Sequence, residues 1–164
     1  MGIKFTTPQE AIDDLMNVIP AIIESEIIRA FSYLGEQCIK RIRDRGPKES
    51  WFDQTGNLRS SIGYAVYDYG KKVIESTFEV VKNGSQGASV GRKVIDDLAS
   101  KYAETYALVV VAGMDYAEAV EARDGKDVLA STELWAKQET PRLMERAKEK
   151  IERRIAQLQK QLGL

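Results

Sequence analysis

The residues with the most potential for chemistry are two pairs of adjacent carboxylates, Asp13-Asp14 and Asp96-Asp97. Carboxylates that face each other can divide acid and base roles between them. Both pairs lie in segments with helical periodicity, however, where neighbouring side chains do not face each other. The chain also has no histidine, which removes the commonest general base and the favourite zinc ligand. We therefore interpret both pairs as solvated helix faces and expect no catalytic residue, no metal site and no enzymatic activity.

A group of glycines and a single cysteine complete this inventory. Gly84, Gly87 and Gly91 match neither the phosphate-loop nor the dinucleotide-binding spacing, and Lys93 is not followed by Ser or Thr. No cofactor is therefore expected. Cys38 cannot form an internal disulfide, and its apolar helical neighbours favour a buried small hydrophobe over a reactive thiol.

The charges are segregated along the chain, although the formal net charge is −1. Residues 115–139 hold seven acidic and three basic residues, whereas residues 141–164 hold seven basic and three acidic residues. A basic terminal helix can bind phosphates. Its acids stand three or four residues from bases, however, and no aromatic residue lies among them for base stacking. A regulatory or nucleic-acid-binding module that uses this helix is therefore the less favoured alternative.

The chain has the size of one domain, residues 1–164. Its longest strongly apolar run, residues 107–112, is far too short to span a membrane, so no membrane partner is expected. Between two helical segments, residues 53–131 contain the alternating patterns and short helices of a sheet layer. This organisation predicts a single α+β domain.

Helical periodicity predicts an N-terminal helical arm at about residues 8–45 and a C-terminal helix at about residues 132–162. Thr7 is placed to cap the first helix. Pro20 is expected to kink or split it, and Pro141 is a point where the last helix can restart. The last helix carries an apolar stripe, which either packs on its own sheet or first helix, as we favour, or forms a seam with a partner. This stripe comprises Met144, Ala147, Ile151, Ile155, Leu158 and Leu162.

Alternation with a period of two predicts the strands. The first starts at Leu58, is expected to be covered on one face, and forms a hairpin with residues 74–80 through a turn at residues 68–71. A third strand, residues 106–112, is apolar on both faces and is expected at the centre of the sheet. Further expected elements are a mobile loop at 83–91, a short helix at about 94–102, a helical turn at 116–121 capped by Asp115, an Asp124-Gly125 turn and a short strand at 127–131. The predicted fold is α+β: an antiparallel sheet of about four strands with long N-terminal and C-terminal helices and a short inserted helix.

Two short segments carry a recognisable pattern: TGNLRSSI at residues 55–62 and YAEAVE at residues 116–121. Their order and spacing, with long helices around them, resemble the head-tail joining family of tailed bacteriophages, also called tail-completion or neck proteins. The matching residues are Thr55, Gly56, Leu58, Arg59, Ile62, Tyr116, Ala117, Val120 and Glu121. Arg123 departs from the family pattern, in which a glycine commonly stands two residues after the glutamate.

The resemblance implies a minor structural protein of a phage or prophage that acts at the head-tail junction and forms a ring with copies of itself. It implies connector or portal-side proteins and tail-tube proteins as further partners, and the virion as its location after synthesis in the bacterial host cytoplasm. Trp51, Phe52 and Arg59 are candidate interface residues. Trp51 and Phe52 can equally plug the end of the core, and Arg59 can pair with Glu121 across the fold.

Overall fold

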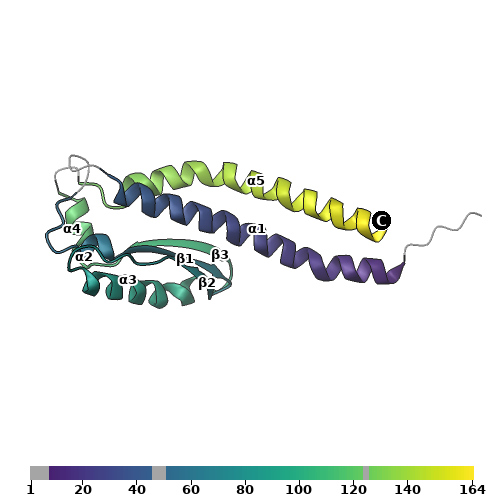
Figure 1. The fold of residues 1–164 in the computed structure, drawn as a ribbon, viewed down its shortest axis with the longest axis horizontal. Helices are drawn as coiled ribbons and strands as arrows, with labels where there is room; N and C mark the ends of the chain where they lie inside the picture. Colours follow the sequence, from purple (N-terminus) through teal and green to yellow (C-terminus); the bar gives the residue numbers. More distant parts are fainter. Residues whose placement is uncertain (1–7, 46–50, 124–125) are drawn as a thin grey trace, which may run out of the picture.

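The structure is a computed structural model that describes residues 8–45, 51–123 and 126–164. Two long helices, α1 (Gln9–Arg43) and α5 (Ala130–Leu162), run antiparallel along its length, and a sheet lies against α1 with α3 (Ser85–Leu98) on its other face (Figure 1). The remaining elements are α2 (Asn57–Ser60), β1 (Ile62–Asp68), β2 (Lys71–Glu75), the 3-10 helix η1 (Ala99–Tyr102), β3 (Tyr106–Ala112) and α4 (Ala117–Glu121). The predicted α+β class is confirmed, and the described residues form three strands rather than about four.

The central strand is β1, in the order β2-β1-β3, and both of its neighbours are antiparallel to it. The prediction of a central β3 was wrong, because β3 lies at an edge of the sheet. Its residues are apolar on both faces because α1 packs on one face and α3 on the other. β1 is buried on both faces between α1 and α3, so the expected single covered face was wrong as well. The hairpin is confirmed: Tyr69 and Gly70 have φ angles of 46° and 82°, as a two-residue type I′ turn requires.

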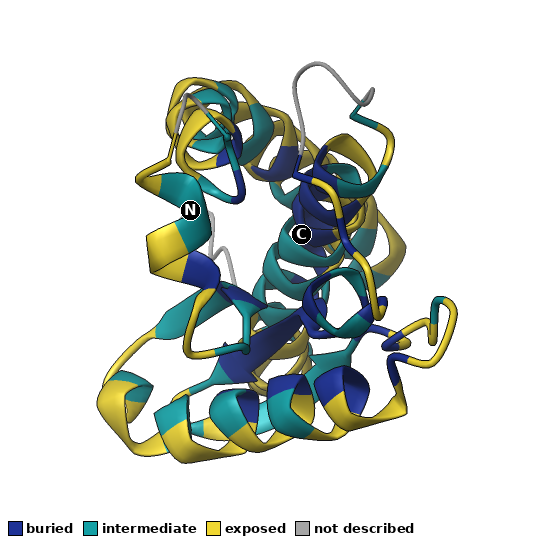
Figure 2. Cartoon of the chain, turned by 90° about the vertical axis from the view of Figure 1, so that its left-hand side faces the viewer, coloured by how far each residue is buried: buried dark blue, intermediate teal, exposed yellow. Residues whose placement is uncertain are grey.

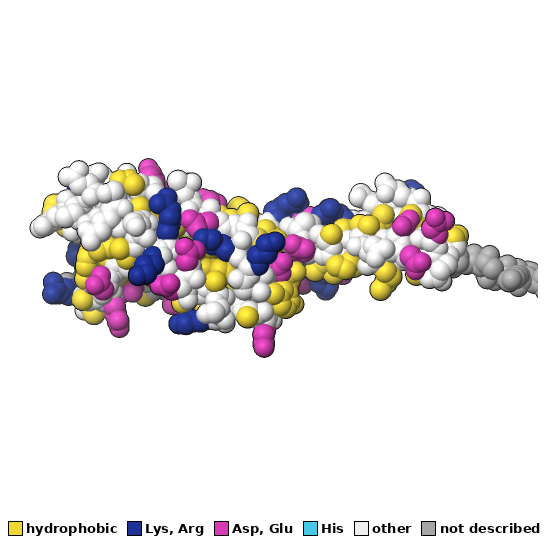
Figure 3. Space-filling view, turned by 90° about the horizontal axis from the view of Figure 1, so that it is seen from below, with side chains coloured by type: hydrophobic (Ala, Val, Ile, Leu, Met, Phe, Trp, Pro, Cys, Tyr) yellow, Lys and Arg dark blue, Asp and Glu magenta, His cyan; other side chains and the backbone are white. Residues whose placement is uncertain are grey.

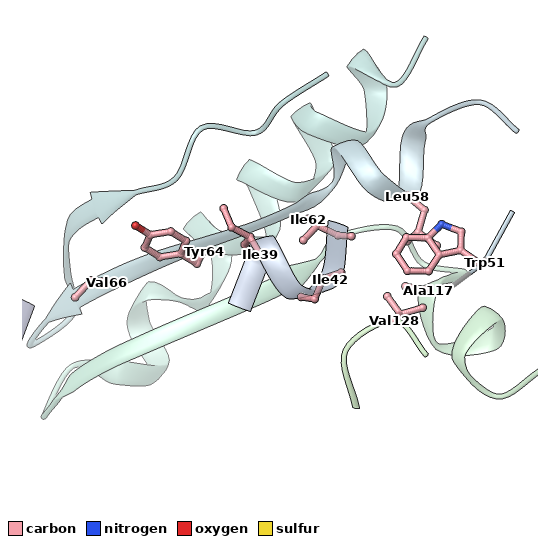
Figure 4. Packing of buried hydrophobic residues seen from close by; sticks show 9 residues of the cluster. All are labelled: Ile39, Ile42, Trp51, Leu58, Ile62, Tyr64, Val66, Ala117 and Val128. Carbon is pink, nitrogen blue, oxygen red and sulfur yellow. The ribbon is translucent and has the colours of Figure 1, made fainter. Parts of the chain in front are cut away.

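Two hydrophobic clusters fill the two sides of the sheet. Figure 2 shows the buried residues where helices and sheet face each other, while the outer face of α3 is exposed. The first cluster, on the α1 side, contains Ile39, Ile42, Trp51, Leu58, Ile62, Tyr64, Val66, Ala117 and Val128 (Figure 4). The second, under α3, contains Ala65, Tyr67, Phe78, Ala88, Ile95, Val109 and Val111.

The segment predicted as a mobile loop, residues 83–91, contains the first half of α3. Its glycines allow backbones to approach closely. A Cβ atom on Gly87 would lie 1.9 Å from the carbonyl oxygen of Asn57, and one on Gly91 would lie 2.6 Å from that of Ser61. The helix therefore needs glycine in order to pack against α2 and the start of β1. The later part of α3 and η1 correspond to the short helix that was predicted at 94–102.

Several element boundaries differ from the prediction. The first strand starts at Ile62 because residues 57–60 form α2, and β2 ends at Glu75 rather than at residue 80. The predicted strand at 127–131 is instead the start of α5 and the segment that leads into it. Asp115 does not cap the helical turn, since α4 follows Tyr116 without a side-chain cap. The Asp124-Gly125 turn and the Thr7 cap lie outside the described residues.

Both long helices continue through a proline, so neither Pro20 nor Pro141 divides its helix. The apolar stripe of α5 lies along α1, as favoured: Ala147 is buried and the rest of the stripe is half-buried. The guanidinium of Arg154 on α5 lies 2.9 Å from the carboxylate of Glu26 on α1, and Glu26 is 2% exposed. None of the described helices is long and apolar enough to cross a membrane.

Candidate partner-binding end

The two motif segments lie more than fifty residues apart in the sequence, and they meet at one end of the molecule. Leu58 and Ile62 from the first segment and Ala117 from the second belong to the same core cluster as Trp51. Figure 4 shows the Trp51 ring beside Leu58, Ala117 and Val128. Trp51 is 5% exposed, so it closes the end of the core, which is one of the two roles predicted for it.

Asp53 holds the turn that precedes α2. Its carboxylate accepts hydrogen bonds from the backbone N–H groups of Gly56 and Arg59, each at 2.8 Å. Gly56 has a φ angle of +84°, and a Cβ atom there would lie 1.9 Å from the carbonyl oxygen of Val81. The Thr55 hydroxyl accepts a further bond from the backbone N–H two residues on, at 3.2 Å. These local bonds favour a helical turn over the strand that alternation predicted here.

Glu121 caps the N-terminus of α5. Its Oε1 atom accepts hydrogen bonds from the backbone N–H groups of Val128, Leu129 and Ala130 at 3.2, 2.7 and 2.6 Å. A helix N-terminus presents unpaired N–H groups and a partial positive charge, and a carboxylate satisfies both. This role is not apparent from the sequence, because the glutamate stands well before the helix that it caps.

Arg45 connects the end of α1 to the same segment, a role that is not apparent from the sequence either. Its guanidinium lies 3.0 Å from the Asp127 carboxylate and donates to the Val128 carbonyl at 3.2 Å. It also donates to the hydroxyls of Ser131 and Thr132 at 2.9 and 2.5 Å. Burial opposes ionisation of Asp127, but hydrogen bonds from Ser131 and the Arg45 charge outweigh it and lower the pKa of Asp127. The segment predicted as a fourth strand is therefore held by side chains rather than by a sheet.

Arg59 contacts the end of α1 and the Trp51 ring. It donates to the carbonyl oxygen of Arg43 at 3.1 Å, and its Cζ atom lies 4.8 Å from the centre of the Trp51 ring. Glu121, its suggested partner, bonds to the start of α5 instead. Arg59 thus supports the packing of Trp51, and its part in an interface remains a prediction.

Phe52 is the most exposed aromatic side chain of this end, at 83%. The Nζ atom of Lys82 lies 5.5 Å from the centre of its ring. Two hollows of about 420 and 310 Å³ flank the ring. Both are lined by Trp51, Phe52, Asp53 and Lys126, and the larger one extends to Thr55, Leu58, Tyr116, Val120 and Arg123. An exposed aromatic ring beside concave surface is typical of a contact with another protein.

The carboxylate pairs and the cysteine lie elsewhere, and one member of each pair has a polar partner. Asp96 forms an ion pair with Lys72 at 2.6 Å, and Asp13 accepts a hydrogen bond from Gln9 at 2.9 Å. Cys38 is 2% exposed, as predicted, and burial raises the pKa of its thiol to about 11. Across the residues that the structure describes, no group of three or more Cys, Asp or Glu side chains could hold a metal ion.

No protein-family model matches the chain, and no curated protein or solved structure is significantly similar to it. The resemblance to head-tail joining proteins therefore rests on the motif residues themselves.

Proposed function

We propose that this protein is a structural component of a tailed phage or prophage and acts in virion assembly at the head-tail junction. The observation that supports the proposal is the convergence of both motif segments on one end, where Phe52 stands outside the core between two hollows. The proposed contacts are with copies of the same chain, in a ring, and with connector and tail-tube proteins. The proposed location is the virion, after synthesis in the host cytoplasm.

The motif residues have distinct roles in this proposal. Leu58, Ile62 and Ala117 join the two segments through the core, whereas Gly56 and Glu121 hold the backbone around them. Trp51 and Arg59 support the contact surface from behind, and Phe52 makes the contact. Because burial leaves Trp51 little surface for a partner, we assign the anchor role to Phe52.

A regulatory or nucleic-acid-binding role through α5 has less support. Four of its bases are in ion pairs. Lys137, Arg142 and Lys148 pair with glutamates of α5 itself at 2.6, 3.6 and 3.4 Å, and Arg154 lies 2.9 Å from the buried Glu26. On the side of the molecule away from α5, seen in Figure 3, acidic and basic side chains are mixed as well, so this face does not present one sign of charge either. Phosphate binding needs cations that are free to displace counterions, so we prefer the assembly role.

The test is a joining assay with a phage whose copy of this gene is deleted. Purified protein added to the mutant lysate should restore joined particles, and Phe52→Ser should restore at most about a tenth as many, since an interface anchor contributes two or more kcal/mol. Tyr33→Ser is the matched control, because Tyr33 is an aromatic residue that is 56% exposed on α1, outside this end. Full joining by a folded Phe52→Ser protein would show that Phe52 does not make the contact and would refute the role proposed for this end.

A further inference from the structure

The outer edge of β3 offers backbone groups to a further strand. The Gly113 N–H donates to the Ser61 carbonyl, and the Tyr69 N–H donates to the Thr105 carbonyl, both at 3.1 Å. With the register of β1 and β3, these bonds direct the backbone groups of odd-numbered β3 residues towards β1. Those of the even-numbered residues point away from the sheet. Among the described residues, no strand pairs with the outward groups of Leu108 and Val110.

The two edges of the sheet differ in how they are protected. β2 is short, has a register shift and carries Lys71, Lys72 and Glu75, and Arg92 adds an ion pair to Glu75 at 3.6 Å. Charges, shortness and irregularity are the usual means of keeping other strands off an edge. β3 has seven residues, YALVVVA, with no charge, no proline and no register shift. By the same criteria β3 is an edge open to pairing.

A groove of about 520 Å³ runs beside this edge. Leu108 and Val110 of β3 line it together with Phe31 and Leu34 of α1, and Ala136 of α5 lines the opposite side. The groove therefore combines backbone groups that no described strand pairs with, an apolar wall on α1, and a mixed wall on α5 that also includes Thr132, Glu133 and Lys137. Because α5 closes its far side, the groove has room for one extended segment rather than for the edge of a second sheet with its own helices.

We propose that this groove binds an extended segment of a different protein, which pairs with β3 as a fourth strand under α5. The N–H and C=O groups of Leu108 and Val110 bond to the backbone of the segment, and every second side chain of the segment, which is apolar, faces α1. Within the described residues, the three strands and the segment around Phe78 pack their apolar side chains in their own core. Neither this chain nor a second copy of it therefore has a spare apolar strand among the described residues, which favours a different protein as the source. This proposal rests on the fold alone and does not require the head-tail role.

Amide hydrogen exchange followed by NMR tests the open edge. In the free protein at low micromolar concentration, the amides of Leu108 and Val110 should exchange at least tenfold faster than those of Val109 and Val111, which bond to β1. Equal protection of all four amides would overturn the proposal. Protection of Leu108 and Val110 that increases with protein concentration alone would also overturn it, because a second copy would then be the occupant.

A peptide probe tests the occupant. The probe has nine residues, with valine at alternate positions, threonine between them and a lysine at each end. Its binding should slow exchange at Leu108 and Val110 at least tenfold and leave Val109 and Val111 unchanged. A peptide with serine in place of valine should not bind. No added protection with the valine peptide at millimolar concentration would refute the proposal.

Two tryptophan variants locate the bound peptide. Ala136→Trp fills the groove from α5 and should weaken peptide binding at least tenfold, while Gln138→Trp adds the same ring to an exposed neighbouring position that does not line the groove. Circular dichroism and thermal unfolding establish that both variants fold. Equal binding by the two folded variants would place the peptide outside the groove and overturn the proposal.

Discussion

Replacing Glu121 with alanine tests whether a motif residue acts through the fold. The change removes an oxygen that accepts three backbone N–H bonds at 2.6 to 3.2 Å from the start of α5. A bond to a charged group contributes about 1.5–3 kcal/mol, and loss of a helix cap costs about 0.5–2 kcal/mol. Because Glu121 is half-buried and water replaces part of these bonds, we expect the free energy of unfolding to fall by about 2–3 kcal/mol.

Urea unfolding followed by circular dichroism measures this loss. With a slope of about 2 kcal/mol per molar urea, the midpoint should fall by about 1–1.5 M. Glu121→Gln keeps one oxygen acceptor and should lose about 1 kcal/mol, chiefly the charge at the helix terminus. The control is Glu118→Ala, an exposed glutamate on the same short helix, which should change stability by less than about 0.5 kcal/mol. If Glu121→Ala is as stable as Glu118→Ala, the capping argument is refuted.

Three further changes follow from buried contacts. Helix propensity alone would make Gly87→Ala about 1 kcal/mol more stable. The added Cβ would lie 1.9 Å from the Asn57 carbonyl oxygen, however, so the melting temperature should fall. An increase would contradict the packing of α3 on α2. Burial raises the pKa of the Cys38 thiol to about 11. The contribution of the buried neutral thiol to stability is therefore complete below pH 9 and is lost as the pH rises through 11. The folded protein should resist alkylation of Cys38 at pH 8, and rapid labelling would count against burial. Arg154→Met removes one partner of the buried Glu26 and should cost about 1–2 kcal/mol in urea unfolding; no change would mean that Arg29 alone suffices.

The elements that the sequence predicted correctly are those encoded locally. The long helices follow from apolar periodicity, and the β1-β2 turn follows from residues that tolerate positive φ, such as Gly70. The burial of Cys38 followed from its place in an apolar stripe. The expected effect of proline was too large, because α1 and α5 both continue through one. Packing of the rest of each helix outweighs one lost hydrogen bond.

The errors arise where a partner distant in the sequence decides the local structure. The glycines of α3 resemble a flexible loop until the backbone of α2 stands beside Gly87. Residues 127–131 resemble a strand until Arg45 and Glu121 bind their backbone groups. At the candidate site, the sequence suggested interface residues but did not indicate which of them are buried. Trp51 and Phe52 are adjacent, yet one is 5% and the other 83% exposed, and that difference depends on how the whole end packs.

The most direct test of the proposed function is deletion of this gene from a phage that carries it, with electron microscopy of the lysate. The assembly role predicts filled heads and separate, normal-looking tails without joined particles, and purified protein added to the lysate should restore joining. Normal joined particles from the deletion strain would contradict the proposal, and empty or missing heads would assign the protein to an earlier step of capsid assembly.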